Sequence, residues 1–223
     1  MGISERKERE KEKRRAFILD TARRLILERG IDSVSMQDIA TACELSKGTL
    51  YLYFDNKQSL LEEFFHEAGS YFLDYVQQKI RPEDSGLQAI RTLWLSYLEI
   101  FGESSEIIVL FGVKNTLNPG FPYIVEENSG AGLQEPLLLF RMIQDILSRG
   151  VADGSLDPSI DPVRVTRTII MITGGIVENV ARLPLAMRNN RIILEEMKET
   201  FEIVLRGLAS PGCDRSLLVL PID

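Results

Sequence analysis

The sequence contains one histidine, His66, and only two cysteines, Cys43 and Cys213. A single histidine supplies too few nitrogen ligands for a histidine-based metal site. Two widely separated cysteines form neither a disulfide framework nor a metal-ligand spacing. We therefore expect no metal ion and no cofactor. His66 falls on the polar side of its predicted helix, so we expect its side chain to be exposed.

Long apolar runs are also missing from the chain. The longest, residues 168–177, is about half the length that a membrane-spanning helix needs. The N-terminus is charged where a secretory signal would carry an apolar segment. We therefore expect a cytoplasmic protein that does not associate with membranes.

The chain also lacks an excess of positive charge, because its formal net charge is −7. Binding to nucleic acid needs local positive potential, and here the charge is unevenly distributed. Residues 1–57 hold 12 Lys and Arg against 10 Asp and Glu, whereas the remainder holds 14 against 23. This asymmetry predicts two modules. Residues 5–15 have no apolar side chain, so we expect either a solvated helix start or a basic arm that contacts DNA.

Apolar residues recur at three- and four-residue spacing through most of the chain, and no alternating strand pattern of useful length occurs, so we predict an all-α fold. Gly30 is a predicted helix stop, and Ser35 and Ser46 are predicted N-caps, with Asp38 completing a capping box. The predicted helices run from 17 to 30, over about 36–43 and 46–54, from a cap at 55 or 56 to 81, and over 84–102, 104–116, 121–129, 133–150, 161–186 and 190–209. Residues from 210 onward have no periodic signal, which predicts a loose tail.

Two short helices joined by a tight turn, at 36–43 and 46–54, form a helix-turn-helix pattern. Lys47 and Lys57 lie in the first turns of their helices, where the helix dipole disfavours a cation by some tenths of a kcal/mol. An external phosphate would resolve both conflicts. Gly48 costs a helix up to about 1 kcal/mol, but it lets a partner approach the backbone closely. The pattern therefore predicts DNA binding.

The run ILDTARRLILERGIDSVSMQDIATACELSKGTLYLYFDNKQSLLEEFF resembles the N-terminal domain of the tetracycline-repressor (TetR) family in spacing and residue type, over about a fifth of the chain. The matching elements are Ala22, Gly30, Ile39-Ala40, the run from Ser46 to Tyr51, Tyr53-Phe54, Lys57 and Leu60. The resemblance implies that the helix at 46–54 enters the major groove. It also implies DNA-facing positions at Ser35, Gln37, Lys47, Gly48, Thr49, Tyr51, Tyr53 and Lys57, and we include Ser46 with them.

One residue departs from the family pattern, because Glu44 stands at the turn where family members usually have glycine. A left-handed backbone at Glu44 would store about 1–2 kcal/mol of strain, and its charge would face phosphate unfavourably.

The resemblance also implies a domain order: an N-terminal arm and DNA-binding domain over 1–57, a helical ligand-binding and dimerisation domain over 58–209, and a tail over 210–223. Aromatic residues concentrate in the first part of the second domain. They form either a ligand pocket or plain core. The candidate pocket residues are Phe65, Phe72, Trp94, Tyr97, Phe101, Phe111, Phe121 and Tyr123.

The helices at 133–150 and 161–186 have wide apolar faces that could form half of a four-helix dimer interface, and Gly174-Gly175 would permit close helix approach. Burial within one subunit is the alternative. Glu178 and Asn179 are either interface polar groups or ligand contacts. The candidate interface residues are Leu138, Met142, Ile146, Ile169, Thr173, Ile176, Val177 and Val180.

These features together predict a homodimeric transcriptional regulator. The resemblance further implies a repressor that is released from a palindromic DNA operator by a small apolar or aromatic ligand, through a shift of the helix that starts near 57. A helical interaction adaptor or regulator without such a ligand is the alternative. We expect no enzyme activity, because the sequence has no Ser/His/Asp set, no glycine-rich phosphate loop and no metal-ligand spacing.

Overall fold

A computed structural model describes residues 3–103, 134–183 and 190–221. Apart from an isolated bridge between Leu156 and Ala209, the described residues contain no β-structure, so the all-α prediction is confirmed. The helices are α1 (Ile3–Arg29), α2 (Met36–Ala42), α3 (Lys47–Tyr51), α4 (Lys57–Lys79), α5 (Gly86–Glu103), α7 (Gln134–Ala152), α8 (Pro162–Arg182) and α9 (Asn190–Leu208), with short 3-10 helices η1 (Ile31–Ser33) and η3 (Arg215–Leu218). The helices predicted at 104–116 and 121–129 lie outside the described residues. Among the helices of the described part, none is long and apolar enough to cross a membrane.

Side-chain caps fix where the N-terminal helices begin. The Ser35 hydroxyl accepts a hydrogen bond from the Asp38 N–H, and the Asp38 carboxylate accepts one from the Ser35 N–H, which is the predicted capping box. Ser46 caps α3 by accepting from the Thr49 N–H at 3.1 Å. Of the two predicted caps for α4, the structure uses Asn56. Caps of this kind contribute about 1 kcal/mol each.

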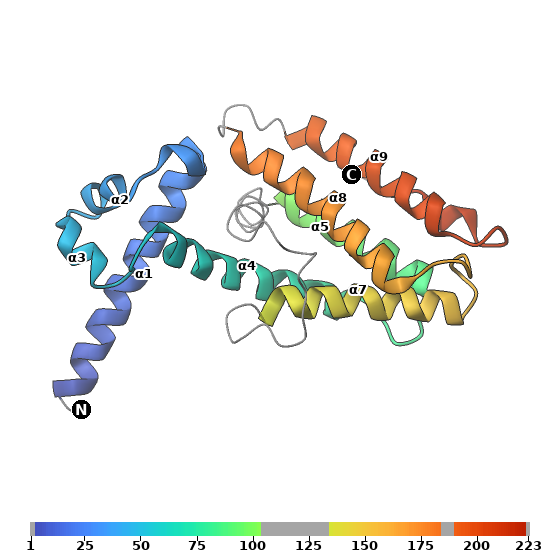
Figure 1. The fold of residues 1–223 in the computed structure, drawn as a ribbon, viewed down its shortest axis with the longest axis horizontal. Coiled ribbons are helices and arrows are strands. Elements are labelled where there is room, and N and C mark those ends of the chain that lie inside the picture. Colours follow the sequence, from blue (N-terminus) through green and yellow to red (C-terminus); the bar gives the residue numbers. More distant parts are fainter. Residues whose placement is uncertain (1–2, 104–133, 184–189, 222–223) are drawn as a thin grey trace.

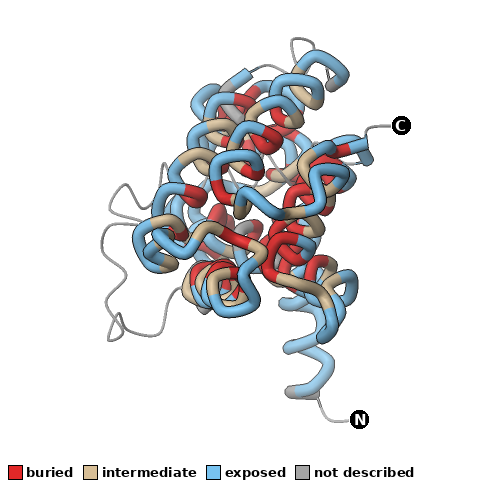
Figure 2. Tube along the Cα trace, turned by 90° about the vertical axis from the view of Figure 1, so that its right-hand side faces the viewer, coloured by how far each residue is buried: buried red, intermediate tan, exposed pale blue. Residues whose placement is uncertain are grey.

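Helix α1 extends well beyond the predicted start at 17. Its first turns consist of Glu, Lys and Arg, which are good helix formers, and Arg6 pairs with Glu10 one turn later at 3.1 Å. Residues 5–14 are all exposed, and Figure 2 shows this end of the chain projecting from the rest. The predicted stop is confirmed, because Gly30 has a φ of 82°.

Two apolar cores share helix α4, which runs from the N-terminal helices to the C-terminal ones (Figure 1). Leu60, Leu61 and Phe64 pack with α1, α2 and α3, whereas Phe72 and Val76 pack with α5, α7, α8 and α9. A second connection joins the two parts, because η1 packs against α8. The first turns of α4 therefore belong to the N-terminal core, although the domain boundary at 57 stays a prediction.

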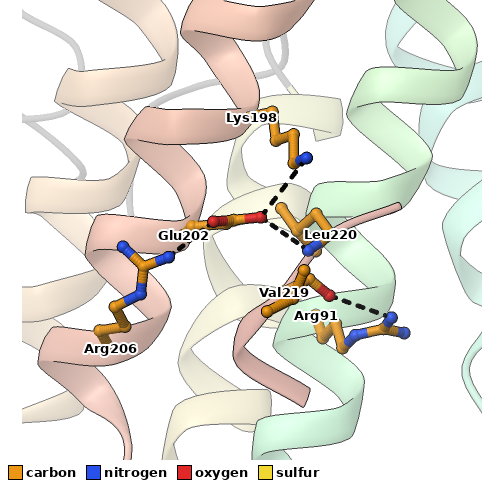
Figure 3. A network of polar contacts seen from close by, with 6 residues as sticks. All are labelled: Arg91, Lys198, Glu202, Arg206, Val219 and Leu220. Atoms are coloured by element: carbon orange, nitrogen blue, oxygen red, sulfur yellow. Dashed lines mark hydrogen bonds and ion pairs between the residues drawn. The ribbon is translucent and has the colours of Figure 1, made fainter. Parts of the chain in front are cut away.

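The C-terminal residues correct the expectation of a loose tail. Leu220 is fully buried, and its N–H donates to the Glu202 carboxylate at 2.9 Å. Glu202 is itself buried and pairs with Arg206 at 2.7 Å and with Lys198 at 3.9 Å, as Figure 3 shows. Periodicity missed this segment because a single leucine in an irregular stretch has no repeat to detect.

Within the subunit, a close helix contact occurs between Gly86 and Gly150. A Cβ atom added at Gly86 would lie 2.2 Å from the Gly150 Cα, so α5 and α7 approach there in a way that only glycine permits. At Gly175, no described residue lies within 4 Å of such a Cβ, so no described helix packs against this position.

Candidate nucleic-acid interface

The buried residues of α3 show which of its residues point outward. Leu50 is fully buried in the N-terminal core, and Phe54 beyond the helix is 2% exposed. The side opposite Leu50 carries Gly48 and Leu52, and both residues are exposed. Figure 1 shows α3 at the end of the molecule remote from α9, where a DNA duplex can approach it. The helix thus presents a small, uncovered surface.

Polar groups surround this surface on α3. Lys47 is exposed, and its ammonium nitrogen lies 5.9 Å from the centre of the Tyr51 ring, which is 40% exposed. The Ser46 hydroxyl lies 2.8 Å from that of half-buried Thr49. Tyr53 is half-buried and packs against the N-terminal core. These side chains can supply a cation and hydroxyl groups to phosphate oxygens.

Helix α2 contributes two of the predicted positions, Ser35 and Gln37, and both are exposed. Ser35 is engaged as the cap, and its hydrogen bonds hold the pKa of the Asp38 carboxyl below its usual value. The Gln37 amide donates to the Thr41 hydroxyl at 3.4 Å. Gln37 therefore keeps an exposed amide, whose carbonyl can accept a further bond.

The structure gives Lys57 a different partner from the external anion that we expected to pair with its ammonium group. Its ammonium group is half-buried and donates to the Ile31 carbonyl. Burial lowers the pKa of Lys57, and the nearby carboxylates of Asp32 and Asp38 offset part of that effect. The Ile31 carbonyl thus accepts a hydrogen bond from the Lys57 ammonium group, which offsets the unfavourable position of this cation at the start of α4. The bond also ties the start of α4 to η1.

The turn between α2 and α3 has the strained backbone that the sequence suggested. Glu44 has a φ of 56°, the left-handed region, and its side chain is exposed. The Leu45 N–H reaches back to the Ala40 carbonyl at 2.9 Å, which closes the turn after α2. For a residue other than glycine, this conformation costs about 1–2 kcal/mol of backbone strain.

We expect Glu44→Gly to raise the free energy of unfolding by about 0.5–1 kcal/mol, because relief of strain exceeds the added freedom of the unfolded chain. Glu44→Gln is the matched control, since it removes the same charge and keeps the strain. Both variants should bind DNA more tightly, whereas only the glycine variant should melt at a higher temperature. Equal melting temperatures for the two variants would contradict the strain at Glu44.

Comparison with known proteins identifies the family. A family model for bacterial regulatory proteins of the tetR family matches residues 18–64. The chain is 31% identical to the HTH-type transcriptional repressor KstR2 of Rhodococcus jostii over 206 residues, which cover 89% of this chain and 92% of that protein. The chain belongs to the TetR family. It is accordingly a DNA-binding transcriptional repressor with a helix-turn-helix.

Solved structures of TetR-family regulators share the fold. The ketosteroid transcriptional regulator KstR2 of Mycobacterium tuberculosis superposes with a TM-score of 0.60 at 20% identity, covering 88% of this chain and 95% of that one. AibR in complex with isovaleryl coenzyme A and operator DNA gives a TM-score of 0.56 at 21% identity, covering 82% and 95%. Both comparisons confirm the predicted N-terminal and C-terminal helical arrangement.

Leu52 was missed by sequence reasoning on this TetR-type domain. Its side chain is 78% exposed, and it lies one turn after Gly48 on the outward side of α3. Leucine in a helical pattern is ordinarily assigned to the core, and only its register against buried Leu50 could have shown otherwise.

The predicted pocket residues that the structure describes lie in the C-terminal core. Phe72, Trp94, Tyr97 and Phe101 are all buried, and Trp94 stacks on Phe201 with ring centres 4.3 Å apart. Burial raises the pKa of Tyr97 to about 12, and a hydrogen bond with Thr173 offsets part of the rise. The side chain of Phe65, together with Phe111, Phe121 and Tyr123, lies outside the described part. His66 is exposed, as expected.

The candidate dimer interface needs revision, because much of it is covered within the subunit. Five of its eight residues are buried there, namely Ile146, Ile169, Thr173, Val177 and Val180. Leu138 is 48% exposed, and Met142 and Ile176 are half-buried. One part of the wide apolar face of α8 packs against α7, and buried Ile169 and Val177 belong to the covered side. The exposed part of this face is the part that a second subunit can contact.

Proposed function

We propose that the chain is a homodimeric repressor that binds a palindromic operator through α3 of each subunit and is released by a small hydrophobic ligand. The outward side of α3 carries this proposal. Lys47 can pair with a phosphate, while exposed Gly48 and Leu52 leave an apolar surface against which base edges fit. Phosphate contacts position the helix, and contacts to base edges select the sequence.

Dimerisation is proposed through the exposed sides of α7 and α8. Leu138 on α7 is 48% exposed and Met171 on α8 is 47% exposed. Gly175 lies one turn beyond Met171 with open space around it, and exposed Asn179 follows one turn later, its amide donating to the Gly175 carbonyl at 2.9 Å. Asn179 thus belongs with the interface rather than with a pocket. Two subunits would present two α3 helices to half-sites about one DNA turn apart, or a multiple of that.

Trp94 supports a ligand site in the C-terminal helices. Its indole N–H is fully buried, and no acceptor lies within hydrogen-bond distance in the part of the chain that the structure describes. An unsatisfied buried donor costs about 1–3 kcal/mol. A hydrophobic ligand with a carbonyl oxygen would satisfy this N–H. KstR2 is named for ketosteroids and AibR was solved with isovaleryl coenzyme A, so steroid ketones and acyl thioesters are the first classes to test.

Two connections would carry the effect of the ligand to α3. Helix α4 packs in both cores, and the bond from Lys57 to the Ile31 carbonyl joins its start to η1, which rests on α8. A ligand that favours another placement of α4 against α8 would shift η1 and change the separation of the two α3 helices. The mechanism is a shift between populations of two placements.

Trp94 is the only tryptophan, so its emission reports on a ligand that reaches it. We expect a steroid ketone or an acyl thioester to change this emission and, at the same concentrations, to lower the anisotropy of labelled upstream DNA bound by the protein. Trp94→Phe removes the N–H and should weaken the response of DNA binding to ligand while leaving DNA binding itself intact. A compound that binds near Trp94 without altering DNA affinity would contradict release by ligand. Absence of sequence-specific DNA binding would contradict the operator role.

A further inference from the structure

The first turns of α1 separate charges that alternate in the sequence. We call residues 5–14 the α1 arm. Each residue of a helix is rotated by about 100° from the one before. This rotation places Lys7, Lys11 and Arg14 side by side, with Glu10 next to them and with Lys13 farther round the helix beside Arg6. Glu5, Glu8 and Glu12 fall on the opposite side. A run that looks balanced in the sequence therefore becomes a helix with one basic face.

This basic face lines a groove beside the DNA-reading helix. The groove has a volume of about 760 Å³. One wall is the basic face of the α1 arm, including Glu10, with Phe17 at the inner end. The other wall consists of Cys43, Glu44 and Leu45 in the turn between α2 and α3, together with Tyr53 just beyond α3. Figure 1 shows the arm leaving the molecule at the end where α3 lies.

The α1 arm is helical because its residues are good helix formers and because it continues the packed part of α1, not because apolar side chains of its own are buried. Its ten residues include no apolar side chain, and all are exposed (Figure 2). A helical segment without tertiary packing is marginally stable in water. Stability alone would not select three adjacent cations on the face that borders the helix-turn-helix. A partner with negative charge would stabilise both the helix and its one-sided charge.

We propose that the basic face of the α1 arm binds the DNA phosphate backbone next to the bases contacted by α3. The proposal rests on the operator-binding function above and adds a second contact surface to it. Four cations line the groove against two carboxylates, Glu10 and Glu44, so its charge is complementary to a phosphodiester strand. Phosphate contacts hold a protein on the duplex without selecting a sequence. The arm thus adds affinity for operator and for other DNA alike.

The test compares two single charge removals in the full-length protein. Lys11→Ala removes a cation that lines the groove, whereas Arg9→Ala removes one from the same arm that does not line it. The net charge changes equally in both. Affinity for operator DNA and for an unrelated duplex of equal length is measured by anisotropy over a range of salt concentrations.

We expect Lys11→Ala to lower the slope of log affinity against log salt by about 0.9 for each lost phosphate contact. Affinity should fall about fivefold per contact near 0.15 M salt. Operator and unrelated DNA should be affected equally, so the ratio of their affinities stays unchanged. Arg9→Ala should retain the wild-type slope. Equal behaviour of the two variants, with operator binding intact, would overturn the role of the α1 arm alone. Failure of the wild-type protein to prefer any operator would overturn both proposals.

Discussion

Replacing Gly175 by glutamate is expected to separate the two subunits and to lower operator affinity at least about a hundredfold, because one recognition helix alone binds weakly. The residue is exposed on α8, and an added Cβ meets none of the described residues of its own subunit within 4 Å. In a dimer formed through α7 and α8, two glutamates would instead be buried close to the two-fold axis. Like charges without partners are costly there, so the dimer should dissociate.

Gly207→Glu is the matched control for this prediction. Gly207 lies on α9, is exposed, and also has nothing within 4 Å of an added Cβ. The Gly207→Glu substitution adds the same charge and changes helix propensity in the same way, but on α9 instead of α8. Sedimentation velocity should show monomers for Gly175→Glu and dimers for Gly207→Glu, with unchanged helical circular dichroism in both. Persistence of the dimer in Gly175→Glu would place the interface elsewhere.

Features that depend on neighbours in the sequence were predictable from it. The caps at Ser35 and Ser46 involve residues three positions apart, and the stop at Gly30 depends on the backbone of that residue. The strain at Glu44 was suggested by the family resemblance, because glycine usually stands at this turn, and the φ of 56° confirms the left-handed backbone. These local rules located the helix-turn-helix because each one acts within a single helical turn.

Features that depend on distant partners were not predictable. The acceptor for Lys57 is the Ile31 carbonyl, 26 positions earlier, and no local pattern reveals it. Periodicity showed that α8 is apolar, but it could not show that Ile169 and Val177 are buried within the subunit while Met171 stays exposed. Which side of a wide apolar face is covered depends on the packing of other helices. The candidate interface therefore contained core residues.

Gly48→Leu is the variant that most directly separates stability from function. The Cβ of a residue at 48 would meet only the Ser46 hydroxyl oxygen, at 3.9 Å, which is an ordinary contact. Glycine is a poor helix former, so replacing it by leucine should raise the free energy of unfolding by about 0.5–1 kcal/mol. Packing against the described residues therefore does not require glycine at this position.

The same substitution should weaken operator binding about a hundredfold, at about 1.4 kcal/mol for each of two half-sites. The larger side chain would hold the α3 backbone away from the base edges and displace Lys47 from its phosphate. Gly207→Leu gains a similar helix propensity on α9 and should leave DNA affinity unchanged. If DNA approaches α3 closely at Gly48, Gly48→Leu should raise the melting temperature and lower the operator affinity. Gly207→Leu should raise the melting temperature without lowering the affinity. Thermal unfolding and anisotropy measure these two quantities. A Gly48→Leu protein that is more stable and still binds its operator normally would show that α3 meets DNA through another face.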